Sequence, residues 1–136
     1  MSEVTKKNRP EFRNIHVTQL ANYRLPLAGL ISILHRISGF LMFALLPFIL
    51  YLLDQSLLSE GTFAYFKGIT SNWFFKLVLL ALSWAFIHHF CAGIRHLFMD
   101  NHIGIEKDSA RKSAAIVFAV SLPLAALVAL KLFGAF

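Results

Sequence analysis

The sequence predicts an all-α integral membrane protein with three transmembrane helices, and its composition and charge distribution carry that prediction. Of the 136 residues, 57% are hydrophobic and 15% charged, against about 25% charged in a typical soluble domain. Asp, Glu, Lys and Arg are absent from residues 37–53, 77–94 and 113–130. Each run would span about 26 Å as a helix, close to a bilayer's hydrocarbon core once flanking apolar residues are added. A soluble enzyme is therefore excluded.

The chain divides into a polar arm and a transmembrane domain. Residues 1–24 are polar and mixed in sign, so we expect a cytoplasmic N-terminal arm, and residues 25–136 form the three-helix transmembrane domain. The first span should run from about residue 26 to 53. Pro26 suits the first turn of a helix, and Pro47 is tolerated as a kink near the outer face because neighbouring groups satisfy the backbone in a membrane.

The second and third spans follow at about 73–97 and 113–133. Residues 54–72, which contain Gly61 and Gly68, are expected to form an outer connection. The second span begins with Trp73, a residue typical of the membrane interface. The third span is almost wholly apolar, which is typical of a helix that packs and faces lipid.

The basic residues predict the topology and the compartment. Ten of the 13 Lys and Arg residues lie in the N-terminal part and the second connection, so the positive-inside rule places both in the cytoplasm. This charge needs no nucleic-acid partner. The first apolar stretch begins near Leu25 and reaches full spanning length, unlike a signal peptide, and acidic residues in the arm are unlike a transit peptide. We expect a multi-pass protein of the bacterial cell inner membrane. The single cysteine, Cys91, rules out an intrachain disulfide framework or iron–sulfur cluster.

Polar side chains interrupt the cytoplasmic ends of the first two spans. On the first span they are spaced i, i+3, i+4 and i+7, so they share one helix face. These residues are Ser32, His35, Arg36 and Gly39. Ionisable residues at membrane depth are costly and are functional by default.

The second span carries a matching polar face. His89, Gly93 and His96 are spaced i, i+4 and i+7, and His88 points about 100° away from His89. Because both polar groups lie at the cytoplasmic ends of antiparallel helices, we expect them to meet in space.

These residue types allow two chemistries. A buried imidazole without a nearby carboxylate suits a metal or haem iron; Gly93 would then leave room for a flat macrocycle, and His35, Arg36 and His96 are candidate partners for its propionates. Alternatively, Ser32 and Arg36 could donate to a quinone carbonyl. Structural roles remain open, namely interhelical hydrogen bonds for the histidines and snorkelling for Arg36.

Two motifs resemble a known family. The segment Ser-Ile-Leu-His-Arg-Ile-Ser-Gly at 32–39, preceded by Arg-Pro at 9–10, occurs with His89-x3-Gly-Ile-Arg-His-Leu-Phe-Met-Asp, which ends at Asp100. Together they resemble the cytochrome b membrane-anchor subunits of succinate dehydrogenase, the larger anchor of succinate:ubiquinone oxidoreductase (respiratory complex II). The match runs from Arg9 to Asp100.

The resemblance implies a multisubunit electron-transfer complex of the tricarboxylic acid cycle. A second small three-helix anchor subunit would complete a hetero-oligomeric helical bundle in the lipid. The two anchors would hold a flavoprotein with FAD and an iron–sulfur subunit with its clusters. Succinate would be oxidised in the flavoprotein, and ubiquinone reduced near the cytoplasmic face. A haem b would lie between the two anchors with one axial histidine from each, and no residue of this chain alone would be catalytic.

The resemblance also implies residue roles. The histidine four residues before the motif glycine is His89, which becomes the axial haem ligand. The adjoining His88 is the runner-up, disfavoured by the motif offset and by the face that His89 shares with Gly93. Ser32 and Arg36 fall on quinone-binding positions, and His35 and Arg36 fall near the propionates.

Three other functions remain to be weighed against this one. They are a haem-free structural anchor, the anchor of a quinol:fumarate reductase, and a small transporter. The transporter is disfavoured by the odd number of spans and by the lack of an intramembrane carboxylate.

Overall fold

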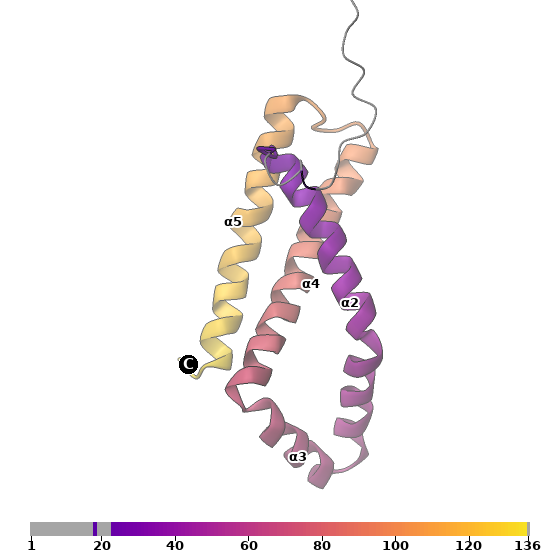
Figure 1. Ribbon diagram of the computed structural model, residues 1–136, viewed down its shortest axis with the longest axis vertical. Helices are drawn as coiled ribbons and strands as arrows, with labels where there is room; N and C mark the ends of the chain where they lie inside the picture. Colours follow the sequence, from indigo (N-terminus) through magenta and orange to yellow (C-terminus); the bar gives the residue numbers. More distant parts are fainter. Residues whose placement is uncertain (1–17, 19–22, 136) are drawn as a thin grey trace, which may run out of the picture.

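The computed structural model describes residue 18 and residues 23–135 and is helical over most of their length. Its helices are α2 (Leu27–Leu58), α3 (Glu60–Thr70), α4 (Trp73–Asp100) and α5 (Lys107–Leu132). The three long helices form an elongated bundle, and α3 joins the far ends of α2 and α4 (Figure 1). Each long helix is apolar enough to cross a membrane, which confirms the three-span prediction. Nearly all of the predicted N-terminal arm lies outside the described residues.

The helices extend beyond the predicted spans. α2 ends at Leu58 rather than near residue 53, and it continues through Pro47. α4 ends at Asp100, and α5 begins at Lys107 rather than Ser113. The charge-free pattern marks only the part of a helix that suits hydrocarbon. The helices continue beyond the charge-free runs as turns that carry polar residues, because helical backbone hydrogen bonding does not require apolar side chains.

The predicted outer connection is itself mostly helix, a feature that the sequence analysis did not predict. Ser59 begins α3 with a capping box: its hydroxyl accepts from the Thr62 N–H at 3.1 Å, and the Thr62 hydroxyl accepts from the Ser59 N–H at 3.1 Å. Glu60 in the first turn and Lys67 in the last turn complement the helix dipole. These end effects outweigh the low helix propensity of Gly61 and Gly68.

The core of the bundle lies where α2, α4 and α5 come together. It is a cluster of Ile31, Ala92, Ala114 and Val117, all buried. Small residues at such positions allow helix backbones to approach closely, which is the main source of packing energy between helices in a membrane. This packing sets the relative positions of α2, α4 and α5 at the end of the bundle that carries the polar residues.

Much of the apolar surface of the described residues is not buried by other described residues. Only 6% of the most apolar window of α2 is buried, and Phe40 and Phe43 are 70% and 77% exposed. Apolar patches of this extent mark membrane or subunit contacts. The exposed apolar surface is therefore suited to contact with a membrane.

Candidate functional site

Three imidazoles cluster between α2 and α4: His35 lies early in α2, and His89 and His96 lie on α4. Figure 1 shows that α2 crosses α4 near the end of the bundle at which α2 begins. The ring of His35 stacks on that of His89, with centroids 4.0 Å apart and planes 13° apart. The ring of His96 also contacts the His35 ring, with centroids 4.9 Å apart and planes tilted by 45°. The expectation that the polar faces of the first two spans meet is confirmed at these residues.

The His89 ring is held at one nitrogen and left open at the other. Its Nδ1 lies 3.0 Å from the carbonyl oxygen of His35 and 3.3 Å from the Ser38 hydroxyl, and Ser38 donates to the same carbonyl at 2.9 Å. Because a carbonyl only accepts, we assign the proton to Nδ1. Nε2 then carries the lone pair, and no described residue hydrogen-bonds to it. This is how metal-ligating histidines are held, with the second ring nitrogen donating to a carbonyl.

Gly39 allows the His89 ring to approach α2 closely. A Cβ atom at position 39 would lie 2.8 Å from His89 Cε1 and 3.3 Å from Nδ1, so any side chain there would displace the ring. By contrast, a Cβ at Gly93 would lie 3.6 Å from His35 Nε2, an ordinary contact. The contact between α2 and α4 therefore requires a glycine at 39 and not at 93.

His88 faces the interior of this chain's own bundle. Its side chain is fully buried, with its ring 5.2 Å from that of Trp84 and 5.7 Å from that of Phe118. Neither ring nitrogen makes a hydrogen bond of good geometry to a described residue, although the backbone of Ile31 on α2 lies near the ring. His88 and His89 thus point to different neighbours, as the helical spacing predicts, and His88 is enclosed by α4 and α5.

Substituting His88 with leucine is expected to leave the thermal stability of the assembled protein unchanged or raise it. An unpartnered buried polar group costs about 1–3 kcal/mol, and an apolar side chain of similar size removes that cost. Thermal denaturation of the purified assembly, with wild type alongside, measures the effect. A lower midpoint for His88→Leu would mean that His88 has a stabilising partner.

Ser32 and Arg36 lie beside the cluster and are not part of its contacts. The buried positions of this part of α2 are Ile31 and Ser38, whereas Ser32 is half-buried and Arg36 is exposed. Neither Ser32 nor Arg36 makes a hydrogen bond in the part of the chain that the structure describes. A guanidinium that the described residues leave unpaired is available to a ligand or to a neighbouring subunit.

Within the described residues, no group of three or more His, Cys, Asp or Glu side chains is placed to hold a metal ion. A metal at His89 would need further ligands from outside this part of the chain. The geometry also adds Ser38 to the site, which the sequence reasoning missed. Its signal was its position three residues after His35, where a serine side chain can reach back to the His35 carbonyl.

Three long apolar helices that bring a cluster of imidazoles together define the class as a helical integral membrane protein. The chain belongs to the succinate dehydrogenase/fumarate reductase transmembrane subunit family, whose model matches residues 5–128. It is 35% identical to the succinate dehydrogenase cytochrome b556 subunit of Paracoccus denitrificans over 98% of each chain. It is 36% identical to the subunit of that name from Coxiella burnetii, over 75% of this chain and 82% of the relative. The resemblance seen in the two motifs is confirmed.

Proposed function

We propose that the chain is the cytochrome b anchor subunit of a succinate dehydrogenase and that His89 supplies one axial ligand to a haem b. The observation that carries the proposal is the His89 ring, with Nδ1 donating to the His35 carbonyl at 3.0 Å and Nε2 left without a partner among the described residues. Neutral imidazole in this arrangement is a good haem ligand. The second axial ligand comes from another anchor chain, which would also cover exposed apolar surface of α2.

The residues present fit a haem on three counts. His89 offers a lone pair in a fixed orientation, Gly39 lets its ring lie close to α2, and the relatives are named cytochrome b556 subunits. When bound, the haem supplies a one-electron redox centre. The chain's own part is to orient the His89 ring through Ser38 and the His35 carbonyl, and to supply cationic or hydrogen-bonding partners for propionates from His35, Arg36 and His96.

Ser32 and Arg36 form this chain's part of the ubiquinone site. They lie one helical turn apart on α2, and neither donates a side-chain hydrogen bond to another described residue. Their hydroxyl and guanidinium can donate to a quinone carbonyl oxygen. The guanidinium also stabilises the negative charge that develops on that oxygen during reduction. The site lies at the end of the bundle that the positive-inside rule places in the cytoplasm of a bacterial inner membrane.

The partners follow from the same assignment. A flavoprotein with FAD and an iron–sulfur subunit dock on the cytoplasmic face, so that electrons from succinate arrive at the end of the bundle that holds the histidine cluster. The two anchor chains hold them at the membrane. The complex then works in the tricarboxylic acid cycle and in respiratory electron transfer.

Substituting Arg36 with leucine is expected to lower ubiquinone reduction by the complex at least about tenfold, because a charged donor to the quinone oxygen is lost. Succinate oxidation measured with a soluble dye should be unchanged, since it needs only the flavoprotein and iron–sulfur subunits. Arg111→Leu, which removes an exposed arginine from α5, is the matched control. Equal quinone activity in the two variants would remove Arg36 from the site.

The assembled complex tests the proposal as a whole. Its absorption spectrum should contain the bands of a b-type cytochrome, and succinate should reduce them in a complex that also reduces ubiquinone. A complex with these activities and no such bands would be a haem-free anchor. A complex that reduces fumarate with quinol far faster than it oxidises succinate would belong to the fumarate reductase branch of the family.

A further inference from the structure

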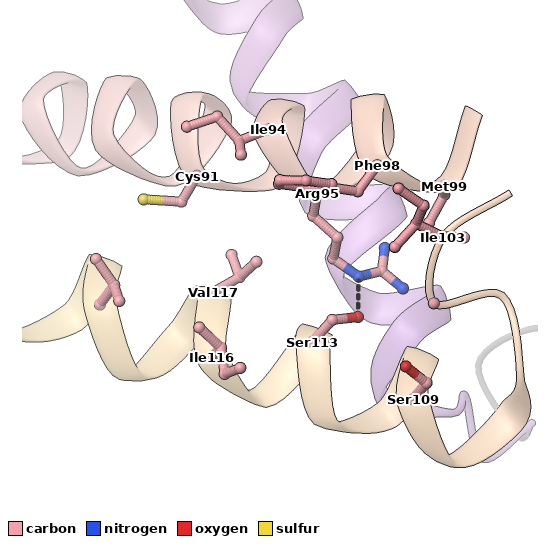
Figure 2. A pocket seen from close by; sticks show the side chains of 12 residues that line it. Cys91, Ile94, Arg95, Phe98, Met99, Ile103, Ser109, Ser113, Ile116 and Val117 are labelled. Atoms are coloured by element: carbon pink, nitrogen blue, oxygen red, sulfur yellow. Dashed lines mark hydrogen bonds between the residues drawn. The ribbon is translucent and has the colours of Figure 1, made fainter. Parts of the chain in front are cut away.

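An apolar groove with a buried cation at one end lies between α4 and α5, away from the histidine cluster. Its volume is about 450 Å³, within the range of about 300–1,000 Å³ typical of ligand pockets. Arg95, Ser109 and Ser113 form the polar end, while Cys91 lies toward the apolar end (Figure 2). Val120 also lines the groove. The residues that line it include no Asp or Glu.

No acidic side chain among the described residues compensates the charge of Arg95. The side chain is only 6% exposed. Its Nε donates to the Ser113 hydroxyl at 3.0 Å (Figure 2). Its Nη2 donates to the Ala110 carbonyl at 3.4 Å. Both acceptors are neutral, and Arg95 makes no ion pair with a described residue. A buried cation without a counter-charge is costly, and an anion at this position would offset that cost.

The polar end of the groove lies at the depth at which an amphiphile would place its head group. Arg95 lies five residues before the end of α4, roughly 8 Å along the axis, which is near the boundary between head groups and hydrocarbon. Cys91 lies one turn deeper. Ile94, Phe98 and Ile116 at the rim are exposed, so the groove borders the surface that faces hydrocarbon. The first turns of α5 add Lys107, Arg111 and Lys112, and basic residues at such a position attract anionic lipids.

From this geometry we propose that the groove between α4 and α5 binds one anionic phospholipid. Its phosphate sits at Arg95 and Ser109, and an acyl chain lies along Cys91, Ile116 and Val120. The Ser109 hydroxyl makes no hydrogen bond to a described residue and is free to donate to a phosphate oxygen. Gly104, with a φ of +76°, leaves the space beside Ser109 open: a Cβ there would lie 3.3 Å from the serine oxygen. This inference requires the membrane-spanning fold and is independent of the haem and quinone assignments.

The test uses the assembled complex, purified and stripped of lipid. Mixed micelles supply dioleoylphosphatidylglycerol or its neutral phosphatidylcholine counterpart, and native mass spectrometry counts the lipids retained. Wild type should retain one phosphatidylglycerol in preference to phosphatidylcholine. Arg95→Gln should weaken that retention about tenfold, as expected for loss of a charge-assisted contact. Lys67→Gln, with the same change of charge on an exposed residue of α3 away from the groove, should retain it.

A second variant keeps the test decisive if Arg95→Gln fails to assemble. Ile116→Trp fills the groove without changing charge and should block retention of the lipid. Equal retention of the two lipids by wild type, or unchanged retention by Ile116→Trp, would overturn the proposal. The same measurement is repeated with glycerol phosphate in place of the lipid. If glycerol phosphate is retained as strongly as phosphatidylglycerol, the site binds a free anion. A cross-link from residue 116 to another subunit would show that protein fills the groove, and either result would also overturn the proposal.

Discussion

Substituting His89 with leucine is expected to abolish haem binding by the assembled complex. An axial histidine supplies one of the two coordination bonds of a six-coordinate haem, and leucine has no donor atom. The reduced spectrum of the purified complex should lose its b-type bands, with the haem content falling to near zero per flavin. Succinate oxidation with a soluble dye reports whether the flavoprotein and iron–sulfur subunits remain assembled.

The adjacent histidine provides the matched control for this experiment. His88→Leu makes the same change one position earlier, where the side chain is enclosed between α4 and α5 against Trp84 and Phe118. That variant should keep the haem bands. The assignment fails if His88→Leu loses haem while His89→Leu retains it.

Substituting Gly39 with valine is expected to have the second-largest effect. Even the Cβ of a new side chain would lie 2.8 Å from His89 Cε1, and the ring has no free rotation to avoid it because Nδ1 is tied to the His35 carbonyl. The ring must turn or the helices must separate, and overpacking of this kind typically costs about 1–3 kcal/mol. Haem content per flavin should fall several-fold, and the thermal midpoint of the complex should fall with it.

Two other glycines separate the causes of that loss. Gly68→Ala, at a position with no heavy atom within 4 Å of the new Cβ, should be neutral. Gly93→Ala meets only His35 Nε2 at 3.6 Å, so the protein itself tolerates it, and haem loss in that variant would mean that a macrocycle lies beside position 93. Normal haem content in Gly39→Val would show that the His89 ring does not need its present position.

The spans were predictable because hydrocarbon excludes charge over a fixed thickness. Three charge-free runs therefore located α2, α4 and α5 to within about one or two turns. α3 was missed because its stability comes from its ends, through the Ser59 capping box, and not from an apolar period. The C-terminal end of α2 and the start of α5 were missed for a related reason, since hydropathy does not register polar turns outside the charge-free runs.

The sequence predicted which residues come together at the candidate site, but not the geometry of their contacts. Equal depth on antiparallel helices brought His35 and His89 together, and the structure places them in ring contact. Whether His88 or His89 faces α2 depends on the rotation of α4 about its axis. That rotation is set by packing at Ala92, Ala114 and Val117. The contribution of Ser38, and the closeness of Gly39 to the imidazole, depend on a ring orientation that spacing does not specify.

The iron ligation of the complex in a His89→Met variant tests the central claim most directly. A thioether in place of an imidazole keeps a donor at the same position of α4 and raises the potential of the haem. If His89 is an axial ligand, the variant complex should have an altered ligand signature in electron paramagnetic resonance and magnetic circular dichroism, together with a higher midpoint potential than wild type. A haem with the wild-type signature and potential in that variant would contradict the account.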